Sequence, residues 1–226
     1  MPKEQRLIEN IIVIGAGGHA KVSVDILQLE GKNNLVGVLA EDDKVQEVLG
    51  YPLLGSEKDL PALVKKHALK GIVIAVGDNF TRATVTARIK ENFSKLKILS
   101  ALHPKAIIAR DVKIGEGTVV MAGVSVNTGS ALGRGCILNT NVSLDHDTSM
   151  GDFSSLAPGV IVGGDCTIGT HAAIGIGATI LHGIQIGEHS VVGAASLVNK
   201  AIPPFTVAYG IPTKEIRKRK KGERYL

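Results

Sequence analysis

The order of hydrophobic and polar positions divides the chain into two parts with different periods. Up to about Leu99, short apolar runs alternate with segments of helical spacing. The apolar runs predict strands at 11–15, 35–39 and 71–77, and the segments between them predict helices at 19–31, 56–68 and 80–93. Strand–helix alternation of this kind favours a small parallel sheet with helices on its faces, an α/β fold of the Rossmann type.

The first of these predicted helices has an apolar face and a defined end. Val22, Ile26 and Leu29 recur at helical spacing, which predicts that these three side chains are buried against the sheet. Gly31 follows directly, and a glycine at this position is typical of a helix C-cap in the left-handed conformation. We therefore expect one complete strand–helix unit before the second strand.

From Ile108 onward the helical pattern ends, and an aliphatic residue or methionine returns at every sixth position. The sixteen positions are Ile108, Ile114, Val120, Val126, Leu132, Leu138, Leu144, Met150, Leu156, Val162, Ile168, Ile174, Ile180, Ile186, Val192 and Val198. A six-residue repeat predicts a parallel β-helix, in which each repeat is one short strand and the aliphatic side chain fills the interior. With three strands to a coil, sixteen repeats predict about five coils.

The two periods predict the domain organisation. We expect a Rossmann-like domain at 1–102, a β-helix at 103–202 and a short C-terminal turn and tail at 203–226. The last thirteen residues, KEIRKRKKGERYL, contain seven of the lysines and arginines of a chain with a net charge of +5. We interpret this run as a solvated tail, with binding to the phosphates of a cofactor as the alternative. No helix-turn-helix or RNA-stacking motif accompanies the run, so a nucleic-acid partner is not expected.

Composition limits the remaining function classes. No apolar run approaches the ~20 residues needed to cross a bilayer, and the start, MPKEQRLIENIIVIGAGG, lacks the anatomy of a signal peptide. We therefore expect a cytoplasmic protein without membrane insertion. Its two cysteines, Cys136 and Cys166, are thirty residues apart and cannot form a CxxC metal knuckle, which favours reduced core residues.

His146 is the best candidate for chemistry in the repeat region. It lies two residues after Leu144, so the register places it outside the β-helix and close to a corner. Imidazole has a pKa suited to a general base near neutral pH, and a neighbouring carboxylate can fix its tautomer. Sequence alone leaves open whether Asp145 or Asp147 supplies that carboxylate, and a solvated surface histidine is the alternative reading.

Residues eighteen apart stack in adjacent coils, so the register also predicts the neighbours of His146. Gly164 falls one coil further on, at a rise of ~4.8 Å, and His182 falls two coils further on, roughly 10 Å away. At that separation His182 could not share a metal ion with His146 within one chain, although histidines from two chains could do so.

Taken together, the chain resembles the NeuD-like sialic-acid O-acetyltransferase family, which includes the PglD-type nucleotide-sugar N-acetyltransferases. The segments that carry the resemblance are IGAGGHAKV (14–22), LAEDD (39–43), AVGDN (75–79), LHP (102–104), NTNVSLDHD (139–147), GDFSSLAPGV (151–160) and VAYGIP (207–212). The resemblance implies a left-handed β-helix, acetyl-CoA as co-substrate, a nucleotide-sugar acceptor and a homotrimer. It also implies that Asp147 orients His146 and that the backbone N–H of Gly164 helps to bind the oxyanion.

The resemblance further implies positions for both substrates. The acetyl-CoA positions are Ser155, Gly164, Ile176, Ala194 and Gly210, with Arg217 and Lys218 as partners for the phosphates. The sugar and pyrophosphate positions are Gly17, Gly18 and His19, and the nucleoside positions are Glu41, Asp42 and Gly77. Ser155 departs from the family, in which a histidine often stands there, so a donor role for this position is in doubt.

The glycine turn GAGGHA (15–20) has a second reading. It fits the dinucleotide fingerprint that follows a strand, and this fit alone would suggest NAD. The motif is more general, however, because its glycines let backbone N–H groups bind any phosphate at a helix N-terminus. His19 could also serve as a structural cap.

The predicted function is acetyl transfer from acetyl-CoA to an amino group of a nucleotide-activated amino sugar, with His146 as general base and without a metal. O-acetylation of sialic acid or a related hydroxyl is the nearest alternative. A zinc-dependent hydratase of the β-helix type, an NAD-linked enzyme and a non-catalytic nucleotide-sugar binder are the remaining alternatives.

Overall fold

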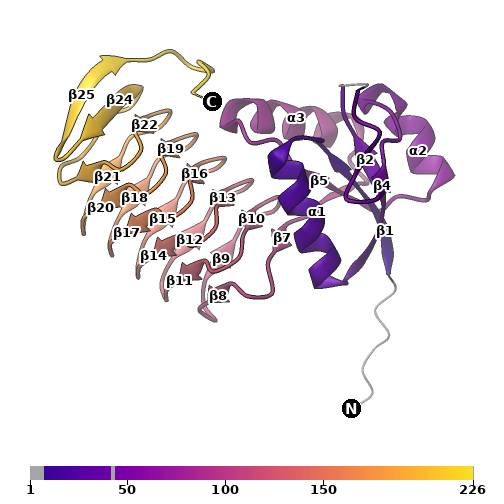
Figure 1. Ribbon diagram of the computed structural model, residues 1–226, viewed down its shortest axis with the longest axis horizontal. Coiled ribbons are helices and arrows are strands. Elements are labelled where there is room, and N and C mark those ends of the chain that lie inside the picture. The colour runs from indigo at the N-terminus through magenta and orange to yellow at the C-terminus, as the bar shows by residue number, and fades with distance from the viewer. Residues whose placement is uncertain (1–7, 42–43, 226) are drawn as a thin grey trace.

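A computed structural model describes residues 8–41 and 44–225 of the chain (Figure 1). The N-terminal part contains a parallel sheet with the strand order β2-β1-β5-β6. Its strands are β1 (Glu9–Ile14), β2 (Asn33–Leu39), β5 (Gly71–Ile74) and β6 (Lys97–Ile98), with a small hairpin of β3 (Glu47–Val48) and β4 (Tyr51–Pro52). Its helices are α1 (Gly18–Glu30), α2 (Leu60–Lys66), α3 (Asn79–Asn92) and a 3₁₀ turn at Glu57–Asp59. The predicted α/β fold is confirmed.

Helices cover both faces of this sheet. Ile11 and Val13 of β1 pack in one apolar cluster with α1, whereas Ile12 and Ile14 pack in a second cluster with α2 and α3. All four side chains are buried, as expected for a strand in the middle of a parallel sheet. None of the helices in the described part of the chain has the length and apolar character needed to cross a bilayer.

The buried face of α1 differs in part from the prediction. Ile26 is buried, but Val22 and Leu29 are 38% and 54% exposed. The helix packs instead on the face that carries Ala20 and Val24, because that face meets the sheet and the first coils of the β-helix. Gly31 ends the helix at φ 59°, as the sequence predicts.

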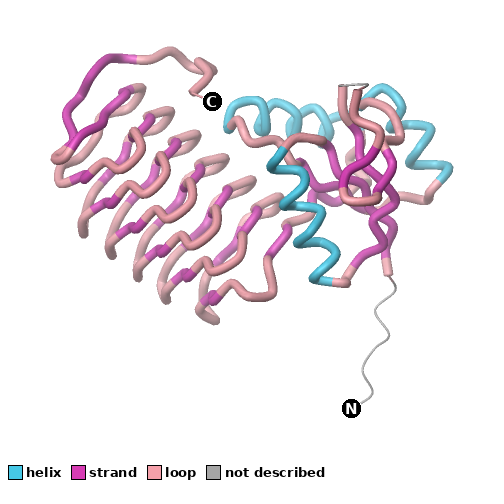
Figure 2. Tube along the Cα trace, in the orientation of Figure 1, coloured by secondary structure: helices cyan, strands magenta, loops and turns pink. Residues whose placement is uncertain are grey.

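The β-helix consists of two-residue strands in three parallel sheets, with helices confined to the N-terminal part of the described chain (Figure 2). We call the first sheet the docking sheet; its two-residue strands are β7 (Ala101–Leu102), β10 (Val119–Val120), β13 (Ile137–Leu138), β16 (Ser155–Leu156), β19 (Ala173–Ile174) and β22 (Val191–Val192). Two longer strands extend this sheet at its C-terminal end: β24 (Thr206–Gly210) and β25 (Thr213–Lys218), which pairs antiparallel with β24. The second sheet holds β8 (Ile107–Ile108), β11 (Ser125–Val126), β14 (Ser143–Leu144), β17 (Ile161–Val162), β20 (Thr179–Ile180) and β23 (Leu197–Val198). The third holds β9 (Lys113–Ile114), β12 (Ala131–Leu132), β15 (Ser149–Met150), β18 (Thr167–Ile168) and β21 (Gln185–Ile186).

The six-residue register holds residue by residue. Strands pair with partners eighteen residues away, as Leu144 does with Val162, and the second residue of the strands points into one continuous apolar core. The structure has about six coils rather than five, because β7 adds a repeat before Ile108, at Leu102, and Ile202 adds another after Val198. After Val198 the register ends, and Ile202 closes the last coil through a bridge to Ile186.

The outer face of the docking sheet carries the N-terminal part and the C-terminal tail. Ala101, Val119 and Ile137 point outward from the first three strands and pack in the same cluster as α1. The tail returns from β25 toward the beginning of α3, where the C-terminus lies in Figure 1. Two segments from opposite ends of the chain therefore meet on this sheet.

Arg82 of α3 fastens the two parts to each other. Its guanidinium is buried and donates hydrogen bonds to the carbonyl oxygens of Gly135 and Phe153 at two corners of the β-helix, at 2.8 and 3.2 Å. It also donates to the carbonyl oxygens of Val76 and Gly77 and to Oδ1 of Asn79, at 2.9, 2.9 and 2.7 Å. Burial lowers the pKa of Arg82 to about 10, so the side chain stays charged at neutral pH.

Candidate active site

His146 lies in the turn after β14, at the corner between the second and third sheets, and 45% of its side chain is exposed. Its Nδ1 atom is 2.8 Å from Oδ2 of Asp147. Asp145 makes different contacts, because its Oδ1 accepts hydrogen bonds from Nδ2 of Asn127 and from the backbone N–H of His146, at 2.7 and 2.8 Å. The geometry therefore pairs the imidazole with Asp147.

This pairing has an electrostatic consequence. The hydrogen bond to Asp147 raises the pKa of His146 above its usual range, and the nearby carboxylates add to the effect against a small cost of burial. A carboxylate at Nδ1 favours the tautomer with its proton there, which leaves the Nε2 lone pair to accept a proton. The dyad thus has the electronic arrangement of a general base.

Gly164 lies against the imidazole in the next coil, as the eighteen-residue stacking predicts. A Cβ atom built on Gly164 would lie 2.7 Å from both Nε2 and Cε1 of His146. A glycine is therefore required for the ring to rest on the backbone at this corner. This contact places the Gly164 backbone beside the nitrogen that would exchange the proton.

Two further side chains extend the group at this corner. The rings of His146 and His182 are 6.3 Å apart between centroids, closer than the expected ~10 Å for two coils, because their side chains lean toward the intervening coil. There, Oδ2 of Asp165 is 3.2 Å from Nε2 of His182. His146, Asp147 and Asp165 each offer a ligand atom within 4.8 Å of the others, so these three exposed residues could hold a metal ion.

A second group of predicted site residues lines a cavity of about 450 Å³ on the docking sheet. His19 and Gly77, predicted to bind the acceptor, are in its wall, together with Ser155, Ile176 and Ala194, predicted to bind acetyl-CoA. The rest of the wall is mostly apolar and includes Ile137, Leu156, Ala157, Ala173, Ile174, Val191 and Val192. The structure thus brings the positions predicted for two substrates together in one hollow.

His19 gives this cavity a neutral polar group. Its Nε2 atom is buried and has no hydrogen-bond partner among the described residues. Burial lowers the pKa of His19 to about 4, and the nearby Arg82 adds to the shift. The imidazole is therefore uncharged at neutral pH. Just before it, Gly17 and Gly18 start α1, and a Cβ at either would meet no atom within 4 Å, so the helix N-terminus is open to a ligand.

Glu41 and Gly210 are not in the wall of this cavity. Glu41 lines a separate hollow with Glu57 and Arg88, and the predicted position Asp42 lies outside the described residues. Gly210 ends β24 with φ 114°, and its N–H donates to Oγ of Ser196 at 3.1 Å.

The basic C-terminus is solvated as predicted, since six of its seven Lys and Arg side chains are exposed, but it is folded rather than a free tail. Residues 213–218 form β25, and the side chain of Arg219 is buried, with Nη1 donating to the carbonyl oxygen of His189 at 2.9 Å. Arg217 forms an ion pair with Glu223 at 2.7 Å, and Lys218 forms one with Glu215 at 3.3 Å. The tail is folded because its charges have partners within it and on the β-helix.

Sequence reasoning missed two residues of the cavity region. Tyr225 lines the cavity, and the backbone N–H of Asn79 donates to its hydroxyl oxygen at 3.1 Å. Asn79 ends the AVGDN segment, and Tyr225 is one of seven Tyr and Phe residues in the chain. An aromatic residue inside a basic run was the available signal that the run packs against the protein.

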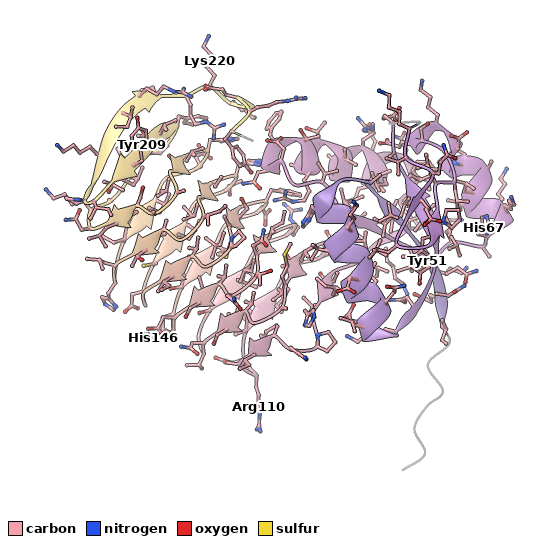
Figure 3. All side chains as sticks on the ribbon, in the orientation of Figure 1. Tyr51, His67, Arg110, His146, Tyr209 and Lys220 are labelled. Carbon is pink, nitrogen blue, oxygen red and sulfur yellow. The ribbon has the colours of Figure 1, made fainter. Side chains whose placement is uncertain are left out.

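The base and the cavity face different directions within one chain. The cavity lies on the docking sheet, whereas His146 lies at the corner between the other two sheets and is not in the cavity wall. In Figure 3, His146 projects from one long edge of the β-helix, and the tail, marked by Lys220, lies on the opposite edge. Within one chain, the two groups of site residues therefore do not form one site.

Known proteins that match this chain in sequence or structure belong to the family that its sequence motifs resemble. The model of the PglD N-terminal domain family matches residues 10–89. UDP-N-acetylbacillosamine N-acetyltransferase of Bacillus subtilis (strain 168) is 32% identical over 117 residues. That match covers 51% of this chain and 52% of the relative, so it spans about half the length of each protein.

Solved structures match over almost the whole chain. PerB from Caulobacter crescentus, in complex with CoA and GDP-perosamine, is 33% identical with a TM-score of 0.87, and the match covers 93% of this chain and 98% of PerB. The protein belongs to the PglD-type sugar N-acetyltransferase family. A further similar structure is the acetyltransferase domain of PglB from Neisseria gonorrhoeae FA1090 with acetyl coenzyme A, at 31% identity, a TM-score of 0.85, and coverage of 92% and 100%. The PglD-type fold, an α/β domain followed by a β-helix, is thus confirmed.

Proposed function

We propose that the protein transfers an acetyl group from acetyl-CoA to an amino group of a nucleotide-activated amino sugar. The observation that carries this proposal is the near full-length match to PerB, whose structure holds CoA and GDP-perosamine. The His146–Asp147 pair, with its contact of 2.8 Å, supplies the base that such a transfer requires.

The proposed chemistry uses the groups at the His146 corner. The acceptor nitrogen attacks the thioester carbonyl of acetyl-CoA, and Nε2 of His146 takes the proton that the nitrogen loses. The backbone N–H of Gly164 donates to the oxygen that becomes negatively charged. When the tetrahedral intermediate collapses, the carbon–sulfur bond breaks, and the imidazolium returns its proton to the CoA thiolate. Asp147 stabilises the imidazolium between these two steps.

The two parts of the chain divide the substrates between them. In this proposal, residues 1–102 bind the acceptor, residues 103–202 bind the donor, and residues 203–226 complete the donor site at Gly210. Gly17, Gly18, His19 and Gly77 stand at the carboxyl ends of β1 and β5, where open α/β sheets bind their ligands. Because Ala101 and Leu102 pair with β10, the β-helix begins two residues before the predicted boundary at 103.

The separation of base and cavity supports an assembly of several copies. If the corner with His146 on one chain faced the cavity of its neighbour, the contact would join two different surfaces. Contacts of that type close into a ring when the rotation between copies allows it, and we propose a homotrimer. A cytoplasmic location, where acetyl-CoA and nucleotide sugars are available, is part of the same proposal.

Thiol release from acetyl-CoA tests the proposed function. The acceptor panel should hold amino sugars linked to GDP, UDP and dTDP, together with CMP-sialic acid and free sialic acid. We expect turnover with an amino-sugar nucleotide, and turnover only with a sialic acid would favour the O-acetyltransferase alternative. His146→Ala should lower kcat by about 10²–10⁴-fold, whereas His103→Ala, at a histidine outside both groups, should not. Full activity of His146→Ala would overturn the mechanism.

A further inference from the structure

The last residues of the described chain form a strap across the docking sheet. We use this name for residues 219–225. The backbone N–H of Arg219 donates to the carbonyl oxygen of Phe205 at 2.8 Å, and its Nη1 donates to the carbonyl oxygen of His189 at 2.9 Å. Its Nη2 also donates to the carbonyl oxygen of Glu223, and Oε2 of Glu223 accepts from the N–H of Lys220 at 2.9 Å. The strap is therefore held to the β-helix and folded on itself before it reaches Tyr225.

Tyr225 ends the strap between α3 and the docking sheet. The backbone N–H of Asn79, at the first turn of α3, donates to the phenolic oxygen at 3.1 Å. The side chain of Asn79 donates from Nδ2 to Oγ of Ser155 and to the carbonyl oxygen of Ala172, both at 3.0 Å. Burial raises the pKa of the Tyr225 phenol, and the nearby hydroxyl of Ser155 opposes part of that shift. The phenol is protonated at neutral pH.

The phenolic oxygen of Tyr225 accepts a hydrogen bond from the backbone N–H of Asn79 at 3.1 Å. A phenol also has one O–H to donate, so Tyr225 can donate a hydrogen bond to an oxygen of a ligand in the cavity.

Tyr225 also forms part of the cavity wall. Ser155 and Tyr225 are on the side of the strap, and His19 is on the side of the N-terminal part. Because most of the rest of the wall is apolar, these three side chains and that of Asn139 are the groups that can recognise polar atoms. His19 follows the carboxyl end of β1, so a nucleotide bound at the α/β sheet would direct its sugar into this cavity.

We propose that Tyr225 determines acceptor specificity, with its ring limiting the size of the sugar that the cavity admits and its hydroxyl donating to a sugar oxygen. This inference rests on the proposed function, because it assigns the cavity to the sugar of the nucleotide-sugar acceptor. It also gives the strap a role: the segment carries a specificity residue from the end of the chain to the N-terminal part.

Two substitutions separate the contributions of the hydroxyl and the ring. Tyr225→Phe removes only the hydroxyl and should raise the KM of the acceptor about 5–10-fold, the effect of one neutral hydrogen bond. Tyr225→Ala should raise it further and should admit acceptors with a bulkier sugar substituent that the unaltered enzyme rejects. The KM of acetyl-CoA should stay within about twofold in both variants. Tyr51→Phe, on β4 and outside the cavity, is the matched control.

Deoxy analogues of the acceptor identify the sugar oxygen. For the analogue that lacks the contacted hydroxyl, the unaltered enzyme and Tyr225→Phe should have the same KM. Thermal unfolding of each variant shows whether the fold is kept, and Tyr225→Phe keeps the test valid if Tyr225→Ala unfolds.

The outcomes distinguish this inference from the proposed function. If the unaltered enzyme releases no thiol with any acceptor, the proposed function fails and the inference fails with it. If the unaltered enzyme is active but Tyr225→Phe leaves the acceptor KM unchanged, only the inference is overturned. A rise in the KM of acetyl-CoA alone would likewise overturn it, because Tyr225 would then contact the donor.

Discussion

Nδ1 of His146 lies 2.8 Å from Oδ2 of Asp147, its immediate neighbour in the sequence. Neighbouring side chains usually point apart, and here Asp147 adopts a positive φ of 55° that turns its carboxylate back toward the ring. The contact ties the proposed base to a carboxylate without any help from another part of the chain.

This contact predicts the pH dependence of the reaction. Only neutral His146 can accept a proton, so kcat/KM should rise with pH through a pKa that lies above the usual value for histidine, in line with the raised pKa. Asp147→Asn removes the main cause of that rise, so the midpoint of the profile should move to lower pH. The high-pH plateau of kcat/KM should fall at least about tenfold, because the amide that replaces the Asp147 carboxylate no longer holds the His146 imidazole in the productive tautomer.

Asp145→Asn is the matched control for this profile. Asp145 is also next to His146, but its carboxylate accepts from a backbone N–H and from Asn127 rather than from the ring. Its substitution should leave the midpoint closer to that of the unaltered enzyme. Equal shifts in both variants would show that general negative charge, and not the Asp147 contact, sets the pKa.

Gly164→Ala should reduce the rate without unfolding the protein. The added Cβ would lie 2.7 Å from Nε2 of His146, so the ring must leave its place against the backbone. We expect kcat to fall roughly 10–100-fold, because misplacing a catalytic group by about 1 Å can cost 10²-fold. Stopped-flow or steady-state thiol release measures kcat, and circular dichroism checks the fold. An unchanged kcat would mean that this contact plays no part in turnover.

Metal ions should inhibit the enzyme rather than support it. Zn²⁺ bound by His146, Asp147 and Asp165 would occupy the imidazole that must accept the proton. We expect full activity after EDTA treatment, inhibition by added Zn²⁺, and weaker inhibition of Asp165→Asn. Loss of activity in EDTA with recovery on adding Zn²⁺ would instead support the zinc-dependent hydratase alternative.

Arg82 should be among the residues on which stability depends most. Arg82→Met would leave the buried carbonyl oxygens of Gly135 and Phe153 without their donor. Each buried acceptor left without its donor costs about 1–3 kcal/mol, and a chain of this size should lose roughly 10 °C in Tm. Arg88→Met is the control, because Arg88 is 49% exposed and pairs with Glu57 at the surface, a contact worth less than about 1 kcal/mol. Calorimetry of both variants measures the difference.

The parts of the fold that follow from local chemistry could be predicted from the sequence. The inward residue of a two-residue strand must be apolar to fill a narrow core, so the six-residue register alone locates Leu144 in the core and His146 outside it. The same register placed Gly164 beside that histidine. Stacking gives backbone positions only, which is why the lean of His182 toward Asp165 was not foreseen.

The docking of the tail could not be predicted in this way. Lysines and arginines in a run usually remain solvated, and the partners that bury Arg219 and Tyr225 are a carbonyl oxygen and an N–H far away in the sequence. Asn79 and Tyr225 are 146 residues apart. Backbone groups carry no sequence signature, so a contact made with them is visible only in three dimensions.

Because its coils repeat, the β-helix sets distances along its axis in equal steps. The N-terminal part rests on β7, β10 and β13, and His146 lies in the coil that begins with β13. Because every coil contributes eighteen residues and the same rise of ~4.8 Å, a chain with one coil inserted or deleted between these points would move the His146 corner by one such step. The contacts that Arg82 and Asn79 make with Phe153, Ser155 and Ala172 would then have to form with residues of the inserted coil. By changing the number of coils, evolution or design could therefore adjust the distance between the two substrates to acceptors of different length.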